Sequence, residues 1–396
     1  MINQKMTALG QKSSVIREIF EYGKRRKAEI GEDNVFDFSL GNPSIPAPQE
    51  FTDTLRNLLD SSDPTSLHGY TSAPGDMAAR KRIADGINAR FSLPAAPENI
   101  YMTCGAAASL TITLHALINE GDEVILLAPF FPEYRVFCEK AGAKVVVVRC
   151  SEPDFLPTAE ALEEAITAKT KAIIINSPNN PTGVIIPKAK MEEIASILRA
   201  KQLEYGSDIF IIADEPYREL SYGKEVAYIP NLYDNTVVCY SYSKSLSLPG
   251  ERIGYIFVSP RAVEAKALFA AVCGAGRALG FVCAPSLMQK AVALCDGLTA
   301  DIEIYRQNRD LLFTTLSRMG YSAVYPDGAF YLFLKSPKGT AAEFCEQAKK
   351  YELLLVPGDS FGGEGYVRIS YCVSREQIER ALPAFQKLYD DILGEK

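Results

Sequence analysis

Thr236-Val237-Val238-Cys239-Tyr240 is a β-branched, apolar run that continues into Ser241-Tyr242-Ser243-Lys244. Such a run predicts a strand buried on both faces of a sheet, which carries Lys244 into a loop rich in hydroxyl groups. A poorly solvated lysine near another cation has a lowered pKa, and a neutral amine can form a Schiff base with an aldehyde. The nearby groups that could hold a phosphate on that aldehyde are Ser241, Ser243 and Arg252.

Two other apolar runs also end in polar motifs. Residues 171–176 (Lys-Ala-Ile-Ile-Ile-Asn) lead into Ser-Pro-Asn-Asn-Pro-Thr-Gly, and residues 208–213 (Asp-Ile-Phe-Ile-Ile-Ala) lead into Asp-Glu-Pro-Tyr. An isolated lysine is most often an exposed loop residue. Here three predicted strands each end in a polar motif, and ligands bind at the carboxyl ends of the strands in open α/β sheets. We therefore expect Asn180, Asp214 and Lys244 to share one site.

Strand-like and helix-like segments alternate through the middle of the chain. This alternation predicts an α/β fold with a mostly parallel central sheet and helices on both faces. A different pattern begins near residue 299, where helix-like stretches flank short strands, and it predicts a smaller α+β domain. The expected helices are 106–119, 134–141, 158–168, 188–203, 302–319, 341–350 and 375–393, and the expected strands are 123–128, 144–149, 173–176, 209–213, 236–240, 323–325, 330–334, 353–356 and 367–370.

The composition excludes several classes of protein. A net charge of −7 argues against a nucleic-acid surface. No stretch approaches the ~18 consecutive apolar residues of a membrane helix, and the polar start is not a signal peptide. Nine cysteines without C-x-x-C pairs predict reduced, mostly buried thiols in a cytoplasmic protein. The two histidines, His68 and His115, lack metal-ligand spacing, so no metal site is expected.

Taken together, the motifs resemble the class I and II pyridoxal-phosphate-dependent aminotransferases of fold type I. Asn-Pro-Thr-Gly, Asp-Glu-x-Tyr and Ser-x-Ser-Lys occur in the family's order. Leu40-Gly41-Asn42-Pro43 near the start and Tyr366-Val367-Arg368-Ile369-Ser370 near the end also match, so the resemblance covers nearly the whole chain. It implies a large cofactor-binding α/β domain at residues 46–298 and a small α+β domain formed by residues 1–45 and 299–396.

The resemblance implies roles for individual residues around pyridoxal 5'-phosphate. Lys244 would bind the cofactor, Asp214 would face its pyridine nitrogen, and Tyr217 and Asn180 would hydrogen-bond its phenolic oxygen. Phe131 would stack on the ring, with Phe130 as the competitor. The residues expected at the phosphate are Gly105, Ala106 and Ala107, which precede or open a helix that can bind an anion, together with Ser241, Ser243, Arg252 and, from the neighbouring subunit of a homodimer, Tyr70.

The same resemblance implies the reaction. Arg368 would bind the substrate's α-carboxylate as a bidentate pair, helped by Gly41 and Asn180. Lys244 would carry out the proton transfers, and the other catalytic residues, Asp214 and Tyr217, would assist by tuning the cofactor. The chain would move an amino group from an L-amino acid to a 2-oxo acid by a ping-pong mechanism.

The donor amino acid stays open at this point. Aspartate is the donor to expect, because that activity is common in the family. A second substrate carboxylate would need a cation, and Arg277 lies in a glycine-rich stretch that is expected to be a solvated loop. The rival activities are a carbon–sulfur β-lyase, whose members tend to carry histidine in place of Tyr217, and a synthase of the aminocyclopropane type. A non-catalytic cofactor-binding effector domain is the rival of another class.

Overall fold

Apolar, β-branched runs form a seven-stranded central sheet in the computed structural model, which describes residues 2–11 and 14–394. Every neighbouring pair is parallel except the two pairs that β8 makes, so the predicted mostly parallel α/β fold is confirmed. In spatial order the strands are β2 (Ile100–Thr103), β8 (Gly254–Val258), β7 (Thr236–Ser241), β6 (Phe210–Asp214), β5 (Thr170–Asn176), β3 (Glu123–Ala128) and β4 (Lys144–Arg149).

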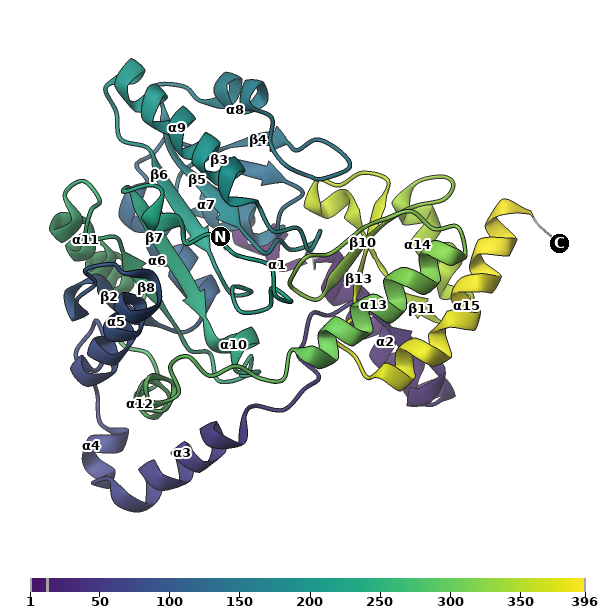
Figure 1. Ribbon diagram of the computed structural model, residues 1–396, viewed down its shortest axis with the longest axis horizontal. Coiled ribbons are helices and arrows are strands. Elements are labelled where there is room, and N and C mark those ends of the chain that lie inside the picture. Colours follow the sequence, from purple (N-terminus) through teal and green to yellow (C-terminus); the bar gives the residue numbers. More distant parts are fainter. Residues whose placement is uncertain (1, 12–13, 395–396) are drawn as a thin grey trace.

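Helices cover both faces of this sheet (Figure 1). On β6, Ile211 and Ala213 belong to one apolar core and Phe210 and Ile212 to the other, as the two-residue period of a strand requires. The first core includes residues of α5 (Met77–Phe91), α8 (Ala159–Ala165), α9 (Lys188–Tyr205) and α12 (Ser286–Leu294), and the second includes residues of α6 (Ala106–Leu117), α7 (Glu133–Lys140) and α11 (Ala265–Ala278).

The expectation of strands buried on both faces fails at β4. Of its six residues only Val148 is buried, although the sequence Lys-Val-Val-Val-Val-Arg is largely apolar. The reason is position, because β4 is the last strand of the sheet and pairs only with β3. The antiparallel strand β8 and its partner β2 were not expected.

The C-terminal part of the chain builds a second unit around a four-stranded antiparallel sheet. Figure 1 shows the purple helix α2 lying among these green and yellow elements. The strand β1 (Phe36–Asp37) pairs with β11 (Leu353–Leu354), so the segment around β1 lies beside the C-terminal part of the chain. The sheet order is β12 (Val356–Pro357), β13 (Tyr366–Ser370), β10 (Tyr331–Lys335) and β9 (Ala323–Val324), and the helices are α2 (Val15–Ile30), α13 (Glu303–Arg318), α14 (Ala341–Lys349) and α15 (Arg375–Leu393).

We keep the domain boundaries at residues 45/46 and 298/299 as a proposal, which the β1–β11 pairing supports.

Within the described ranges, 2–11 and 14–394, no helix combines the length and the apolar character needed to cross a membrane. The remaining elements are the helices α1 (Gln4–Gln11), α3 (Gln49–Ser61), α4 (Pro64–His68) and α10 (Tyr242–Ser245), and short 3-10 turns at Glu32–Asn34, Pro97–Asn99, Ile229–Asn231 and Gly358–Phe361.

Candidate active site

Three parallel strands end side by side and bring the predicted residues together. Asn176, at the end of β5, pairs in register with Asp214, at the end of β6, and Asp214 pairs with Cys239 on β7. The chain beyond these ends lines a cavity of about 290 Å³. The predicted site residues that line it are Gly41, Ala106, Ala107, Phe131, Asn180, Asp214, Tyr217, Ser241, Ser243, Lys244, Arg252 and Arg368.

Lys244 lies in the one-turn helix α10 rather than in the expected loop. Ser241 begins this turn, because its side chain accepts a hydrogen bond from the Ser243 N–H at 3.2 Å. The Lys244 Nζ donates to the carbonyl oxygen of Gly41 over 2.6 Å. Burial, helped by the charges of Arg252 and Arg368, lowers the pKa of the Lys244 amine to about 8. A fraction of the amine is therefore neutral near neutral pH, and this fraction can act as a nucleophile.

One end of the cavity carries groups of the kind that bind anions. Helix α6 begins at Ala106, and Ala106 and Ala107 line the cavity, so the start of the helix, whose first N–H groups have no partner within the helix, lies at the cavity wall. Gly105 has φ +84°, and a Cβ there would lie 2.7 Å from Arg252 Nη2, so only glycine lets the arginine come this close. Arg252 also donates to Ser243 Oγ at 3.4 Å. This end of the cavity thus combines the charge of Arg252, the hydroxyl groups of Ser241 and Ser243, and the start of α6.

Asp214 lies deep in the cavity with one carboxylate oxygen free. Its Oδ2 accepts a short hydrogen bond from the Tyr134 hydroxyl, and its main-chain oxygen accepts from Asn176 Nδ2 at 2.9 Å. Its Oδ1 is buried and has no partner among the residues that the structure describes. Burial raises the pKa of this carboxyl to about 7. A cationic group next to Oδ1 would stabilise the carboxylate form.

Arg368 is a buried cation held by neutral oxygens. It lies on β13 and is only 2% exposed. It donates to the carbonyl oxygen of Ser39 at 2.6 Å and to Asn180 Oδ1 at 3.1 Å. Its Nε has no partner in the described part of the chain, and burial lowers the pKa of the guanidinium. A buried arginine of this kind is suited to bind a carboxylate ligand.

The residues fit pyridoxal 5'-phosphate at three points. The anion-binding end fits its phosphate, the unpartnered Asp214 Oδ1 fits its protonated ring nitrogen, and the Lys244 amine fits its aldehyde. Phe131, rather than Phe130, lines the cavity and could cover the ring. Phe130 is a buried core residue.

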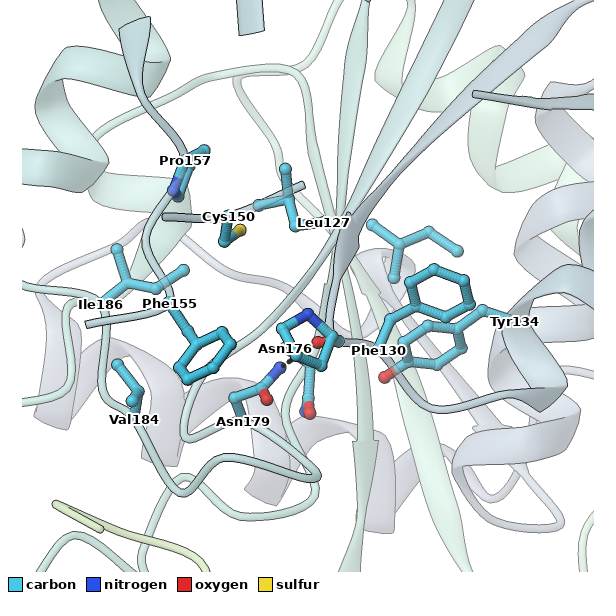
Figure 2. A pocket seen from close by; sticks show the side chains of 12 residues that line it. Leu127, Phe130, Tyr134, Cys150, Phe155, Pro157, Asn176, Asn179, Val184 and Ile186 are labelled. Atoms are coloured by element: carbon cyan, nitrogen blue, oxygen red, sulfur yellow. Dashed lines mark hydrogen bonds between the residues drawn. The ribbon is translucent and has the colours of Figure 1, made fainter. Parts of the chain in front are cut away.

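A smaller cavity, of about 20 Å³, adjoins this site (Figure 2). It is lined by Phe130, Phe155, Asn179 and other residues, and it shares Tyr134 and Asn176 with the main cavity. Its volume suits a single water molecule and no cofactor. It therefore marks the inner wall of the site rather than a second site.

Two predicted residues lie elsewhere in this chain. Tyr70 is 98% exposed and does not line the cavity. Arg277 lies near the end of helix α11, so the expectation of a loop was wrong, although its side chain is exposed as expected. The sequence reasoning missed Tyr134 and Tyr331, which both line the cavity. Tyr331 lies on β10, and its hydroxyl is 2.8 Å from the Tyr217 hydroxyl.

Fold and cavity together are typical of an enzyme, with a buried lysine of lowered pKa, a helix start and a buried carboxylate at the ends of parallel strands. Residues 33–385 match the family model for aminotransferase class I and II. The chain belongs to this family, whose members use pyridoxal phosphate, and it is an aminotransferase.

Individual relatives agree with this assignment. The chain is similar to an amino transferase from Eubacterium rectale with a TM-score of 0.97, at 52% identity and over 99% of each chain. It is 31% identical to an aspartate aminotransferase from Thermotoga maritima, over 93% of this chain and 95% of the relative. It is 28% identical to aromatic-amino-acid aminotransferase 2 from Thermococcus litoralis, over 95% of each.

Proposed function

We propose that this chain binds pyridoxal 5'-phosphate through Lys244 and transfers an amino group from an L-amino acid to a 2-oxo acid in two half-reactions. The observation that carries the proposal is the Lys244 amine, buried and with its pKa lowered to about 8, in the same cavity as the anion-binding end and Asp214. When bound, the cofactor supplies an electron-withdrawing ring that stabilises negative charge beside the reacting carbon.

The residues of the chain would divide the remaining work. Arg252, Ser241, Ser243 and the start of α6 would hold the phosphate, and Gly105 would allow the close approach. Arg368 would hold the α-carboxylate of the substrate, and Lys244, once released, would move the proton at the substrate's α-carbon.

Aspartate is the first donor to test, because relatives from Thermotoga maritima and Pyrococcus abyssi are named aspartate aminotransferases. Another relative is named for aromatic amino acids, so a screen of single half-reactions has to decide. We also propose a homodimer, for which the exposed Tyr70 is the support, and keep the cytoplasmic location as a prediction.

Borohydride reduction of the purified protein tests the assignment. Reduction should fix the cofactor irreversibly, and peptide mapping should place the label on Lys244 and on no other lysine. Lys244→Ala should carry no label, whereas Lys290→Ala, which changes a lysine outside the cavity lining, should be labelled normally. A label on another lysine would refute the assignment of Lys244 as the cofactor-binding residue. Product analysis separates the rivals, since a β-lyase would release ammonia without needing a 2-oxo acid.

A further inference from the structure

Tyr331 joins the second unit of the chain to the central site. It lies on β10, is 2% exposed and faces Tyr217, which follows the central strand β6. The two hydroxyl oxygens are 2.8 Å apart, and the rings meet edge to face with centroids 5.7 Å apart. Both side chains line the cavity. The pair therefore brings two phenol groups to one point of the wall.

Two neutral phenols hold two protons, and the bond between them uses one. Burial raises the pKa of Tyr217 well above its ordinary value and that of Tyr331 to about 12, so both stay protonated at neutral pH. Either hydroxyl can be the donor. If Tyr331 donates, the proton of Tyr217 is free for an acceptor inside the cavity. With Tyr331 as donor to Tyr217 and Tyr217 as donor to that acceptor, both hydroxyl protons form hydrogen bonds.

The surroundings hold Tyr331 in this position. The guanidinium of Arg368 lies 4.7 Å from the centroid of its ring, a cation–π contact. A Cβ at position 41 would lie 2.2 Å from the Tyr331 hydroxyl oxygen, so the absence of a side chain at Gly41 makes room for that hydroxyl group. Gly41 is also the residue whose carbonyl oxygen accepts from Lys244.

We propose that Tyr331 is a positioning residue that donates its proton to Tyr217 and so directs the Tyr217 proton to the phenolic oxygen of the cofactor. The inference rests on the proposed function, because it presupposes a cofactor held by Lys244. A hydroxyl that accepts a hydrogen bond is a better donor, so Tyr331 also strengthens the bond that Tyr217 makes. Stronger donation to an anionic oxygen favours the deprotonated form of the lysine-bound cofactor.

The test is a pH titration of the visible absorbance of the holoenzyme, which needs no turnover. Tyr331→Phe removes one hydroxyl and keeps the ring. The midpoint of the titration should move upward by about half a pH unit. Tyr222→Phe is the matched control, since Tyr222 also donates to a residue next to β10, the carbonyl oxygen of Ala329, but does not line the cavity.

A double-mutant cycle separates positioning from general packing. In a Tyr217→Phe background, Tyr331→Phe should move the midpoint by less than about 0.1 unit, because the partner through which it acts is gone. An unchanged or lowered midpoint in the single variant, an equal shift in Tyr222→Phe, or an additive shift in the double variant would each overturn the inference. A wild-type protein that carries no absorbing cofactor on Lys244 would instead overturn the proposed function.

Discussion

Asp214→Asn should remove a large part of the pH dependence of stability from the cofactor-free protein. The carboxyl of Asp214 is buried, Tyr134 is its hydrogen-bond donor, and its Oδ1 has no partner within residues 2–11 and 14–394. Burial raises its pKa to about 7. Asparagine has nearly the same shape and no proton to lose, so the substitution isolates this titration.

The sign follows from proton linkage. Between the pKa of the unfolded chain, about 4, and the folded value of about 7, the unfolded state has lost this proton while the folded state keeps it. The folded state binds more protons, so stability falls as the pH rises through this window. Three pKa units at about 1.4 kcal/mol each give a loss of about 4 kcal/mol, of which about 2.5 kcal/mol falls between about pH 5 and pH 8.

Urea denaturation of cofactor-free protein at these two pH values measures the effect. The wild type should lose about 2.5 kcal/mol more than Asp214→Asn between them. Asp60→Asn, an exposed aspartate at the end of α3, should behave like the wild type. A pH dependence equal in the wild type and Asp214→Asn, within about 0.5 kcal/mol, would refute the reasoning. Saturating pyridoxal phosphate should also weaken the dependence, because a cationic ring nitrogen favours the carboxylate.

Two other predictions concern the substrate and the partner subunit. Arg368→Lys keeps the charge but loses the planar, two-pronged guanidinium, so the KM for the amino acid should rise by about ten-fold or more. Arg375→Lys on α15 is the control. A KM that stays unchanged in Arg368→Lys would show that another group binds the carboxylate. Tyr70→Ala and Lys244→Ala should each be inactive alone and should recover about a quarter of wild-type activity on mixing, because half of the random dimers are hybrids and each hybrid holds one intact site. Mixtures that stay inactive would show that Tyr70 does not serve the partner's site.

Much of the site could be predicted from sequence because its residues follow directly after apolar strands. In Ile173-Ile174-Ile175-Asn176 and in the run before Asp214, the change from apolar to polar marks the strand end, and parallel strands end at one edge. The strand direction then brings together residues that are far apart in sequence. The same reasoning gave the helices α6, α9 and α15 within a few residues.

Tyr134 and Tyr331 could not be found in this way. Tyr134 lies 80 residues from Asp214, and Tyr331 lies 114 residues from Tyr217. Each tyrosine has a local context that is fully explained by packing, one in helix α7 and one in the apolar strand β10. Hydrogen bonds between distant elements leave no local pattern. The exposure of β4 could not be predicted for a similar reason, because the sequence of a strand does not determine whether it lies at the edge of the sheet.

In the described part of the site, a buried cation and a buried acid each lack a partner at one atom, and this explains why ligands should be bound strongly. Arg368 is a buried cation whose hydrogen-bond acceptors, Ser39 and Asn180, are neutral, and Asp214 is a buried acid with a free oxygen. A buried charge without a partner costs free energy. A substrate carboxylate would offset that cost at Arg368, and a protonated ring nitrogen would offset the cost of ionising Asp214. Under the proposed function, the folded chain therefore holds a cation and an acid that lack ionic partners until the substrate and the cofactor bind. Part of the binding free energy of each ligand comes from supplying that partner.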